Sequence, residues 1–131
     1  MRTRPLSPHL SVYRMSRYTM VTSIFNRFTG LGLSIGLLLL IWWLMAAASG
    51  ARAYEHAQRV LALGIFKVLY AALIVAFCYH LVAGIRHLVW DTGHGLERSQ
   101  SQRSAWIVVL VSILLIAGLG YWLLAGRGHA P

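Results

Sequence analysis

The chain has 131 residues, of which 58% are hydrophobic and 11% charged, and it carries twelve Lys and Arg against three Asp and Glu, a net charge of +9. A soluble domain has about a quarter of its residues charged, so this composition excludes an ordinary soluble protein and indicates a membrane protein. The positive charge does not indicate nucleic acid binding, because the basic residues are spread between apolar stretches that leave no soluble domain to hold a basic groove.

The N-terminal segment, residues 1–22, is polar, and Pro5 and Pro8 oppose a regular helix at its start. We predict an extended segment along the cytoplasmic surface, followed by a helix that begins near Thr22 or Ser23, because either hydroxyl can cap a helix. The segment contains neither the apolar run nor the cleavage site of a signal peptide, so we expect it to be retained.

Two later stretches contain no charged residue at all. They are the 24 residues between Arg27 and Arg52 and the 23 residues between Arg103 and Arg127. Because each stretch is long enough to cross a hydrocarbon core of about 30 Å as a helix, both are predicted to span a membrane.

A third apolar segment lies between them, with Lys67 near one end and Arg86 near the other, where their charged groups can reach the membrane surface. The expected fold class is therefore an all-α membrane protein with three transmembrane helices. We assign residues 23–131 to one membrane-anchor domain and place its spans at about 28–49, 64–90 and 104–125.

The distribution of basic residues predicts the orientation of the chain. Eight of them lie before the first span or around the connection between the second and third spans, and four lie on the other side of the membrane. We therefore expect the N-terminus inside, the C-terminus outside, and the connection with Asp91, His94 and Glu97 in the cytoplasm. The predicted location is a bacterial inner membrane, with the mitochondrial inner membrane as the alternative.

The second span carries the most informative polar residues. His80 and His87 are about two helical turns apart, so they share a face with Gly84 between them, and Asp91 follows four residues after His87. Arg86 is offset around the helix at the cytoplasmic end. A histidine within the hydrocarbon costs free energy unless a partner satisfies it, so His80 is a functional candidate.

This face fits a non-covalently bound haem. A neutral His80 can ligate iron, Gly84 leaves room for a flat macrocycle, and cations at the membrane edge can pair with its propionates. The further candidates for the haem pocket or its propionates are Arg86, His87, Asp91 and Asn26.

No C-x-x-C-H motif is present for covalent attachment, so we expect a b-type haem. No second histidine lies in the middle of either other span, so a second axial ligand is expected from a partner subunit. The alternative is a His80 that only hydrogen-bonds a neighbouring helix.

A second polar cluster lies at the cytoplasmic end of the first helix, where Ser23, Asn26 and Arg27 can share a face. A hydroxyl and a guanidinium can hydrogen-bond the carbonyls of a quinone and stabilise the negative charge that develops on reduction, with Ile24 as an apolar wall. The alternative is a helix cap and an interfacial anchor.

Three stretches carry a family resemblance: RPLSPHLSVYR at 4–14, SIFNRFTG at 23–30 and HLVAGIRHLVWDTG at 80–93. Over almost its whole length the chain resembles the cytochrome b556 membrane-anchor subunits of succinate dehydrogenase, respiratory complex II. The resemblance implies that His80 is an axial haem ligand and that Ser23 and Arg27 belong to a ubiquinone site.

The chain departs from the family motif S-x-x-H-R-x-[ST] at one position, where Asn26 replaces the usual histidine. An amide can neither carry a positive charge nor exchange a proton near neutral pH. Any propionate contact or proton delivery by that histidine is therefore expected to be weaker, relocated or absent in this chain.

The resemblance also implies a place in the electron transport of the tricarboxylic acid cycle. Succinate is oxidised on a flavoprotein subunit, electrons pass through an iron–sulphur subunit, and ubiquinone is reduced beside the membrane anchor. A second anchor subunit would supply the other axial histidine of one shared haem b, and lipid would surround both anchors.

The chain itself has no residues for the dehydrogenase reaction, since it lacks a nucleotide-binding glycine fingerprint and a set of cysteines for a cluster. One alternative is the anchor of a fumarate reductase that uses menaquinol. Another is a small proton-conducting transporter subunit in which His80 and Asp91 relay protons.

Overall fold

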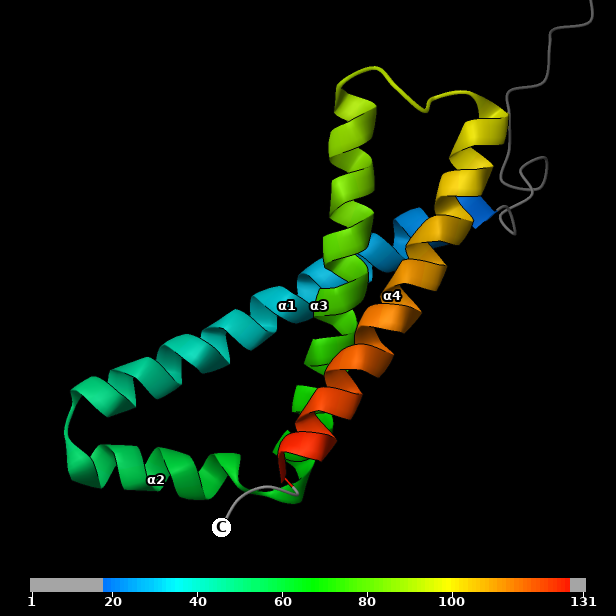
Figure 1. The fold of residues 1–131 in the computed structure, drawn as a ribbon. Helices are drawn as coiled ribbons and strands as arrows, with labels where there is room; N and C mark the ends of the chain where they lie inside the picture. The colour runs from blue at the N-terminus through cyan, green and yellow to red at the C-terminus, as the bar shows by residue number, and fades with distance from the viewer. Residues whose placement is uncertain (1–17, 128–131) are drawn as a thin grey trace, which may run out of the picture.

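The computed structural model describes residues 18–127, and the motif at 4–14 lies outside this range. In chain order the described helices are α1 (Tyr18–Ala48), α2 (Ala51–Leu61), α3 (Gly64–Asp91) and α4 (Arg98–Arg127). Figure 1 shows α1, α3 and α4 as long rods, with the short α2 joining the far end of α1 to the start of α3. No strand occurs between residues 18 and 127.

The three long helices are long and apolar enough to cross a membrane, over Met20–Ala48, Gly64–Asp91 and Arg98–Gly126. A helix of 28 residues measures about 42 Å at the α-helical rise of about 1.5 Å per residue, which exceeds a hydrocarbon core of about 30 Å. The prediction of an all-α protein with three such helices is confirmed.

Two helix boundaries differ from the predicted ones. α1 begins at Tyr18, so residues 18–22 are helical rather than extended, and Thr22 lies inside the helix instead of capping it. α4 begins at Arg98 and thus includes part of the polar connection that follows α3. An apolar stretch marks only the part of a helix inside the hydrocarbon, and the helix continues into the polar region because its backbone bonds are internal.

The connection between the first two spans contains the helix α2, which we did not predict. Gly50 adopts a φ of 106°, a left-handed conformation that lets the chain reverse direction directly after α1. α2 is amphipathic, with Ala57 fully buried and Glu55 exposed. The rings of Trp43 on α1 and Tyr54 on α2 lie 6.1 Å apart, so α2 packs back onto the end of α1.

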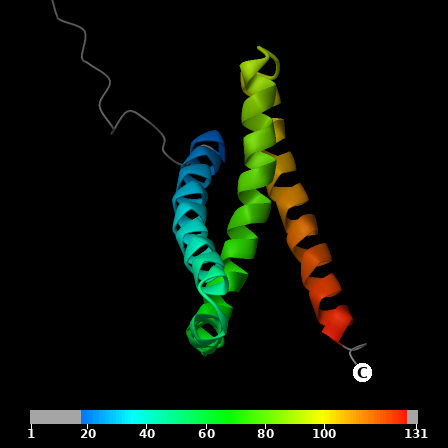
Figure 2. The same cartoon turned by 90° about the vertical axis from the view of Figure 1, so that its left-hand side faces the viewer.

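α3 lies between α1 and α4 and packs against both (Figure 2). Most residues buried where α3 meets its neighbours are small, such as Cys78 and Ala83 on α3 and Ala105 on α4, and Arg86 is the large exception. A Cβ on Gly36 would come within 2.8 Å of the Leu73 side chain, so α1 and α3 also approach closely near the α2 end. Small residues let helix backbones come together in a membrane.

No large side chain in the described range is fully buried, and many apolar side chains are mostly exposed, such as Phe28 at 67% and Leu38 at 66%. A bundle of this kind covers only narrow stripes of each helix. The remaining apolar faces are suited to contact lipid or another membrane chain.

Candidate functional site

His80 lies on α3 and faces one turn of α1. Its Nδ1 is 3.1 Å from the backbone oxygen of Asn26 and 3.2 Å from the hydroxyl oxygen of Thr29. The imidazole is partly buried at this contact. The histidine that the sequence singled out therefore has a specific hydrogen-bonding environment between two helices.

The contact with Asn26 determines the tautomer of His80. A backbone carbonyl only accepts hydrogen bonds, so at 3.1 Å the Nδ1 of His80 must carry the proton and donate it. In a neutral imidazole the other ring nitrogen, Nε2, then holds a lone pair. This is the form in which a histidine ligates a metal while a carbonyl orients its other nitrogen.

Gly30 leaves room for the imidazole. A Cβ at this position would lie 3.0 Å from Cε1 of His80 and 3.6 Å from its Nδ1, and the first distance is too short for an ordinary contact. The backbone of α1 therefore touches the edge of the ring directly, which a larger residue would prevent.

Arg86 is the most heavily bonded side chain in the site, and it is only 7% exposed. Its Nη1 donates to the Thr22 hydroxyl of α1 at 3.1 Å, and its Nε donates to the Ser104 hydroxyl of α4 at 2.9 Å. Its Nη2 donates to the carbonyl and the hydroxyl of Ser101, at 2.9 and 3.3 Å. One guanidinium thus joins α1, α3 and α4.

The aromatic ring of Trp90 extends this polar centre toward the end of α3. The guanidinium carbon of Arg86 lies 4.0 Å from the ring centroid, a cation–π contact, and the His87 ring meets Trp90 edge-on at 5.1 Å. The indole N–H donates to the carbonyl of Gly95 at 3.1 Å, and this bond stabilises the turn between α3 and α4. His87 is therefore an aromatic neighbour of Trp90.

Gly84 and Asp91, the other residues of the predicted histidine face, take no part in the hydrogen bonds and ring contacts described for His80, Arg86 and Trp90. A Cβ at Gly84 would meet nothing within 4 Å in this chain, so helix packing does not require glycine there. Asp91 is exposed at the last residue of α3. Within residues 18–127, Asp91 forms no ion pair with His87 or Arg86.

The second predicted cluster lies at the same end of the bundle as Arg86, because Thr22 of α1 bonds Arg86 directly. Ser23 is half-buried, and Ile24 and Arg27 are exposed. The structure brings this cluster to the end of the bundle that holds His87 and Asp91.

Asn26 is the member of this cluster that turns toward the protein interior. Its side-chain oxygen Oδ1 is buried and accepts no hydrogen bond from the described part of the chain. A buried acceptor without a donor costs about 1–3 kcal/mol. The turn that holds His80 therefore also presents an acceptor for which a bound group or a neighbouring subunit can supply the donor.

The sequence analysis missed the hydroxyl groups that connect the helices, namely Thr22, Thr29, Ser101 and Ser104. It also missed Tyr79, whose hydroxyl donates to the Thr22 carbonyl at 2.7 Å. Isolated hydroxyls in or beside an apolar helix are the available signal, since they commonly bond across helices in membranes.

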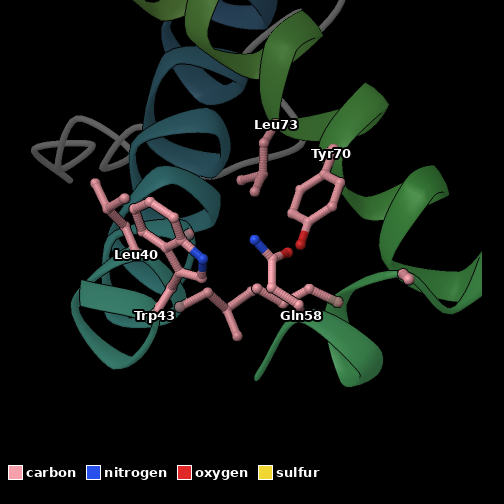
Figure 3. Close-up of a pocket in the computed structure, with 9 residues that line it drawn as sticks. Leu40, Trp43, Gln58, Tyr70 and Leu73 are labelled. Carbon is pink, nitrogen blue, oxygen red and sulfur yellow. The ribbon is translucent and has the colours of Figure 1, made fainter. Parts of the chain in front are cut away.

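A cavity of about 520 Å³ lies at the other end of α1, where it meets α2 and α3 (Figure 3). Its walls are mostly apolar, and the side chains of Gln58 and Tyr70 point toward each other at its edge. None of the candidate haem or quinone residues lines this cavity. It is therefore not the site that the sequence predicted.

Fold and site together define a multi-pass membrane subunit in which a histidine of α3 bonds to one turn of α1. No group of three or more His, Cys, Asp or Glu gathers in the part of the chain that the structure describes. A metal bound at His80 would thus have at most two ligands of these types from the described residues.

Comparison with known proteins is consistent with this class. The family model of succinate dehydrogenase/fumarate reductase transmembrane subunits matches residues 1–119, and the chain belongs to this family. The succinate dehydrogenase cytochrome b556 subunit of Paracoccus denitrificans is 40% identical over 112 residues, which cover 86% of this chain and 85% of the relative. The resemblance recognised from the sequence motifs is confirmed.

Bacterial and mitochondrial relatives both occur. The cytochrome b556 subunit of Rickettsia typhi is 39% identical over 112 residues, covering 86% of each chain. The mitochondrial cytochrome b560 subunit of Homo sapiens is 36% identical over 118 residues, covering 88% of this chain and 69% of the human one. The family match at residues 1–119 covers the first two described spans and most of the third, so the chain is a membrane subunit of an oxidoreductase complex.

The Arg86 network generates a stability prediction. Arg86→Met removes the four hydrogen bonds by which the guanidinium joins α3 to α1 and α4, which should cost on the order of 3 kcal/mol. Arg103→Met, at an exposed position of α4, is the matched control. We expect a lower temperature of thermal unfolding in detergent for Arg86→Met only, and equal temperatures for the two variants would contradict the role of this network.

Proposed function

We propose that this chain is the membrane-anchor and haem b-binding subunit of a succinate:ubiquinone oxidoreductase. In this proposal His80 supplies one axial ligand of a single haem, and Ser23, Ile24 and Arg27 form part of the ubiquinone-reduction site. The observation that carries the proposal is the hydrogen bond from His80 Nδ1 to the Asn26 carbonyl in a chain of this family.

The residues around His80 fit a haem. The Nδ1–H bond leaves the lone pair on Nε2, as an axial ligand requires, and the open space beside Gly84 would accept a flat ring. When bound, the haem would supply one-electron redox chemistry. The chain's own contribution is to hold the imidazole at one orientation with its Nδ1–H on a carbonyl. The name of the relatives as b-type cytochromes supports the choice of group.

A second axial ligand would come from another subunit, because the described residues offer one histidine at this depth. We infer a second membrane anchor that packs on the exposed apolar faces, as well as iron–sulphur and flavoprotein subunits that carry electrons from succinate. Arg86 would contribute to the haem pocket mainly by fixing the three helices, since its hydrogen bonds already go to α1 and α4.

A docked quinone could reach only the accessible groups of α1. The Arg27 guanidinium is exposed and the Ser23 hydroxyl is half-buried one turn before it, so both can donate hydrogen bonds to a carbonyl oxygen of a docked quinone. Arg27 would stabilise the charge that develops on reduction, and Ile24 would contact the apolar ring. Relatives named as succinate dehydrogenase subunits favour succinate oxidation over fumarate reduction as the direction of the reaction.

The proposed orientation places the start of α1 and the turn between α3 and α4 on the cytoplasmic side of a bacterial inner membrane. The bacterial relatives support this location, although a mitochondrial matrix side would be equivalent for the human relative. Electrons from soluble subunits would then reach the Ser23 and Arg27 cluster without crossing the membrane.

The haem assignment predicts a spectral change. His80→Ala should remove or shift the α band in a reduced-minus-oxidised spectrum of the assembled complex, because the iron loses one axial ligand. His56→Ala is the matched control, since this histidine is exposed on α2. An unchanged α band in His80→Ala at normal flavin content would exclude His80 as the ligand.

The quinone assignment predicts a split between two activities. Arg27→Ala should lower succinate:ubiquinone activity by about tenfold or more, as expected for the loss of a charge-assisted hydrogen bond. Succinate oxidation by an artificial electron acceptor should stay near the wild-type rate, and the control Arg103→Ala should leave both rates unchanged. If Arg27→Ala lowered both activities equally, the residue would act in assembly and not at the quinone.

The orientation can be tested with two matched glutamates, Glu55 in α2 and Glu97 just before α4, which are both exposed. In a Cys78→Ser background, we expect a membrane-impermeant maleimide to label Glu55→Cys on intact spheroplasts. Glu97→Cys should react only after the membrane is opened. The reverse pattern would overturn the proposed orientation.

A further inference from the structure

We propose that Thr29 and Gly30 are positioning residues for His80, and that the α1 turn from Asn26 to Gly30 sets the tautomer, ring orientation and electron donation of the haem ligand. This inference rests on the proposed role of His80. It assigns a function to two residues of α1 that approach the iron ligand from the opposite helix.

Two kinds of contact restrict the ring. The Nδ1–H faces the Asn26 carbonyl at 3.1 Å and the Thr29 hydroxyl oxygen at 3.2 Å, while the backbone at Gly30 lies against Cε1. Turning the ring over would place a carbon in front of the carbonyl and lose both polar contacts. One ring orientation is therefore favoured before any metal binds, and it directs the Nε2 lone pair away from this turn of α1.

The Thr29 hydroxyl has its own proton committed to the α1 backbone. It lies 2.8 Å from the Phe25 carbonyl and 3.0 Å from the Asn26 carbonyl, so it donates to α1 and its lone pair is available to accept from His80. Ser34 bonds the Gly30 carbonyl in the same way at 3.0 Å. This hydrogen bond of Ser34 stays within α1, whereas the Thr29 hydroxyl also contacts His80 on α3. The contact across the helices therefore distinguishes Thr29 from Ser34.

These acceptors also change the chemistry of the imidazole. Hydrogen bonds from Nδ1–H to oxygen atoms draw the proton away from the ring, which makes Nε2 a stronger electron donor to a metal. A stronger donor stabilises oxidised iron relative to reduced iron, so it lowers the midpoint potential. With Thr29 and the Asn26 carbonyl both accepting from Nδ1–H, the haem midpoint potential would be lower than with the Asn26 carbonyl as the only acceptor.

The first test uses Thr29→Val and Thr29→Ser in the fully assembled complex. Valine has nearly the shape of threonine but lacks the acceptor, so we expect a midpoint potential more positive than that of the wild type in a haem redox titration. Serine keeps the hydroxyl and should restore the wild-type potential. Equal potentials for the two variants would overturn the role of Thr29, because a purely steric role would not separate them in this direction.

The second test uses Gly30→Ala and Gly32→Ala. A Cβ at Gly30 would press on Cε1 of His80, whereas a Cβ at Gly32 would meet nothing within 4 Å, and both changes add the same methyl group to α1. We expect Gly30→Ala to weaken haem retention about tenfold, measured as the haem-to-flavin ratio after washing, as is typical when a supporting group of a metal ligand is disturbed. Gly32→Ala should retain haem like the wild type, and equal ratios would contradict the role of Gly30.

The outcome with His80→Ala separates this inference from the proposed function. If His80→Ala keeps its haem band, His80 is not the ligand and both proposals fail. If His80→Ala loses the band while Thr29→Val and Gly30→Ala both behave like the wild type, His80 is the ligand but α1 does not position it. If Gly30→Ala does not assemble, the potentials of the Thr29 pair decide the question.

Discussion

A polar side chain inside an apolar helix bundle must find its hydrogen-bond partners within the protein, because the surrounding hydrocarbon offers none. In this chain that requirement governs how α1 meets α3. Arg86 and Tyr79 both donate hydrogen bonds to Thr22 of α1, and His80 donates one to the carbonyl of Asn26. Sliding α1 along α3 by one turn would break all of these contacts together. The polar groups therefore determine the register of α1 along α3. The small buried residues only allow the helix backbones to approach closely.

The two polar centres on α3 are six residues apart, or about 9 Å along the helix, and they differ in what they leave available. Arg86 directs its hydrogen bonds to both neighbouring helices and stacks on Trp90, so its charge is used inside the bundle. His80 uses one nitrogen for α1 and keeps the other. Arg86 therefore has a structural role, whereas His80 keeps one ring nitrogen for the ligand role proposed above.

The spans could be predicted because long stretches without charge fit the interior of a membrane. His80 could be singled out as a candidate because an imidazole within an apolar span needs a partner. The hydroxyl partners could not be predicted in the same way. The long helices are apolar on every side, so periodicity does not reveal which face meets which neighbour, and the pairing of Thr22 with Arg86 or Thr29 with His80 depends on that choice. The sequence suggested Arg86 as a propionate partner because its position near the membrane edge was visible while its neighbours were not.

The thinness of the buried core has a consequence in the cell. Many of the larger apolar side chains are mostly exposed, and the proposed second anchor would cover part of them. An anchor that binds only the folded chain would raise the stability of this chain with the anchor's concentration by mass action. An unassembled copy would then open more often and be removed by proteases sooner than an assembled one. The amount of this chain in the membrane would thereby follow the supply of its companion subunits without any dedicated regulator.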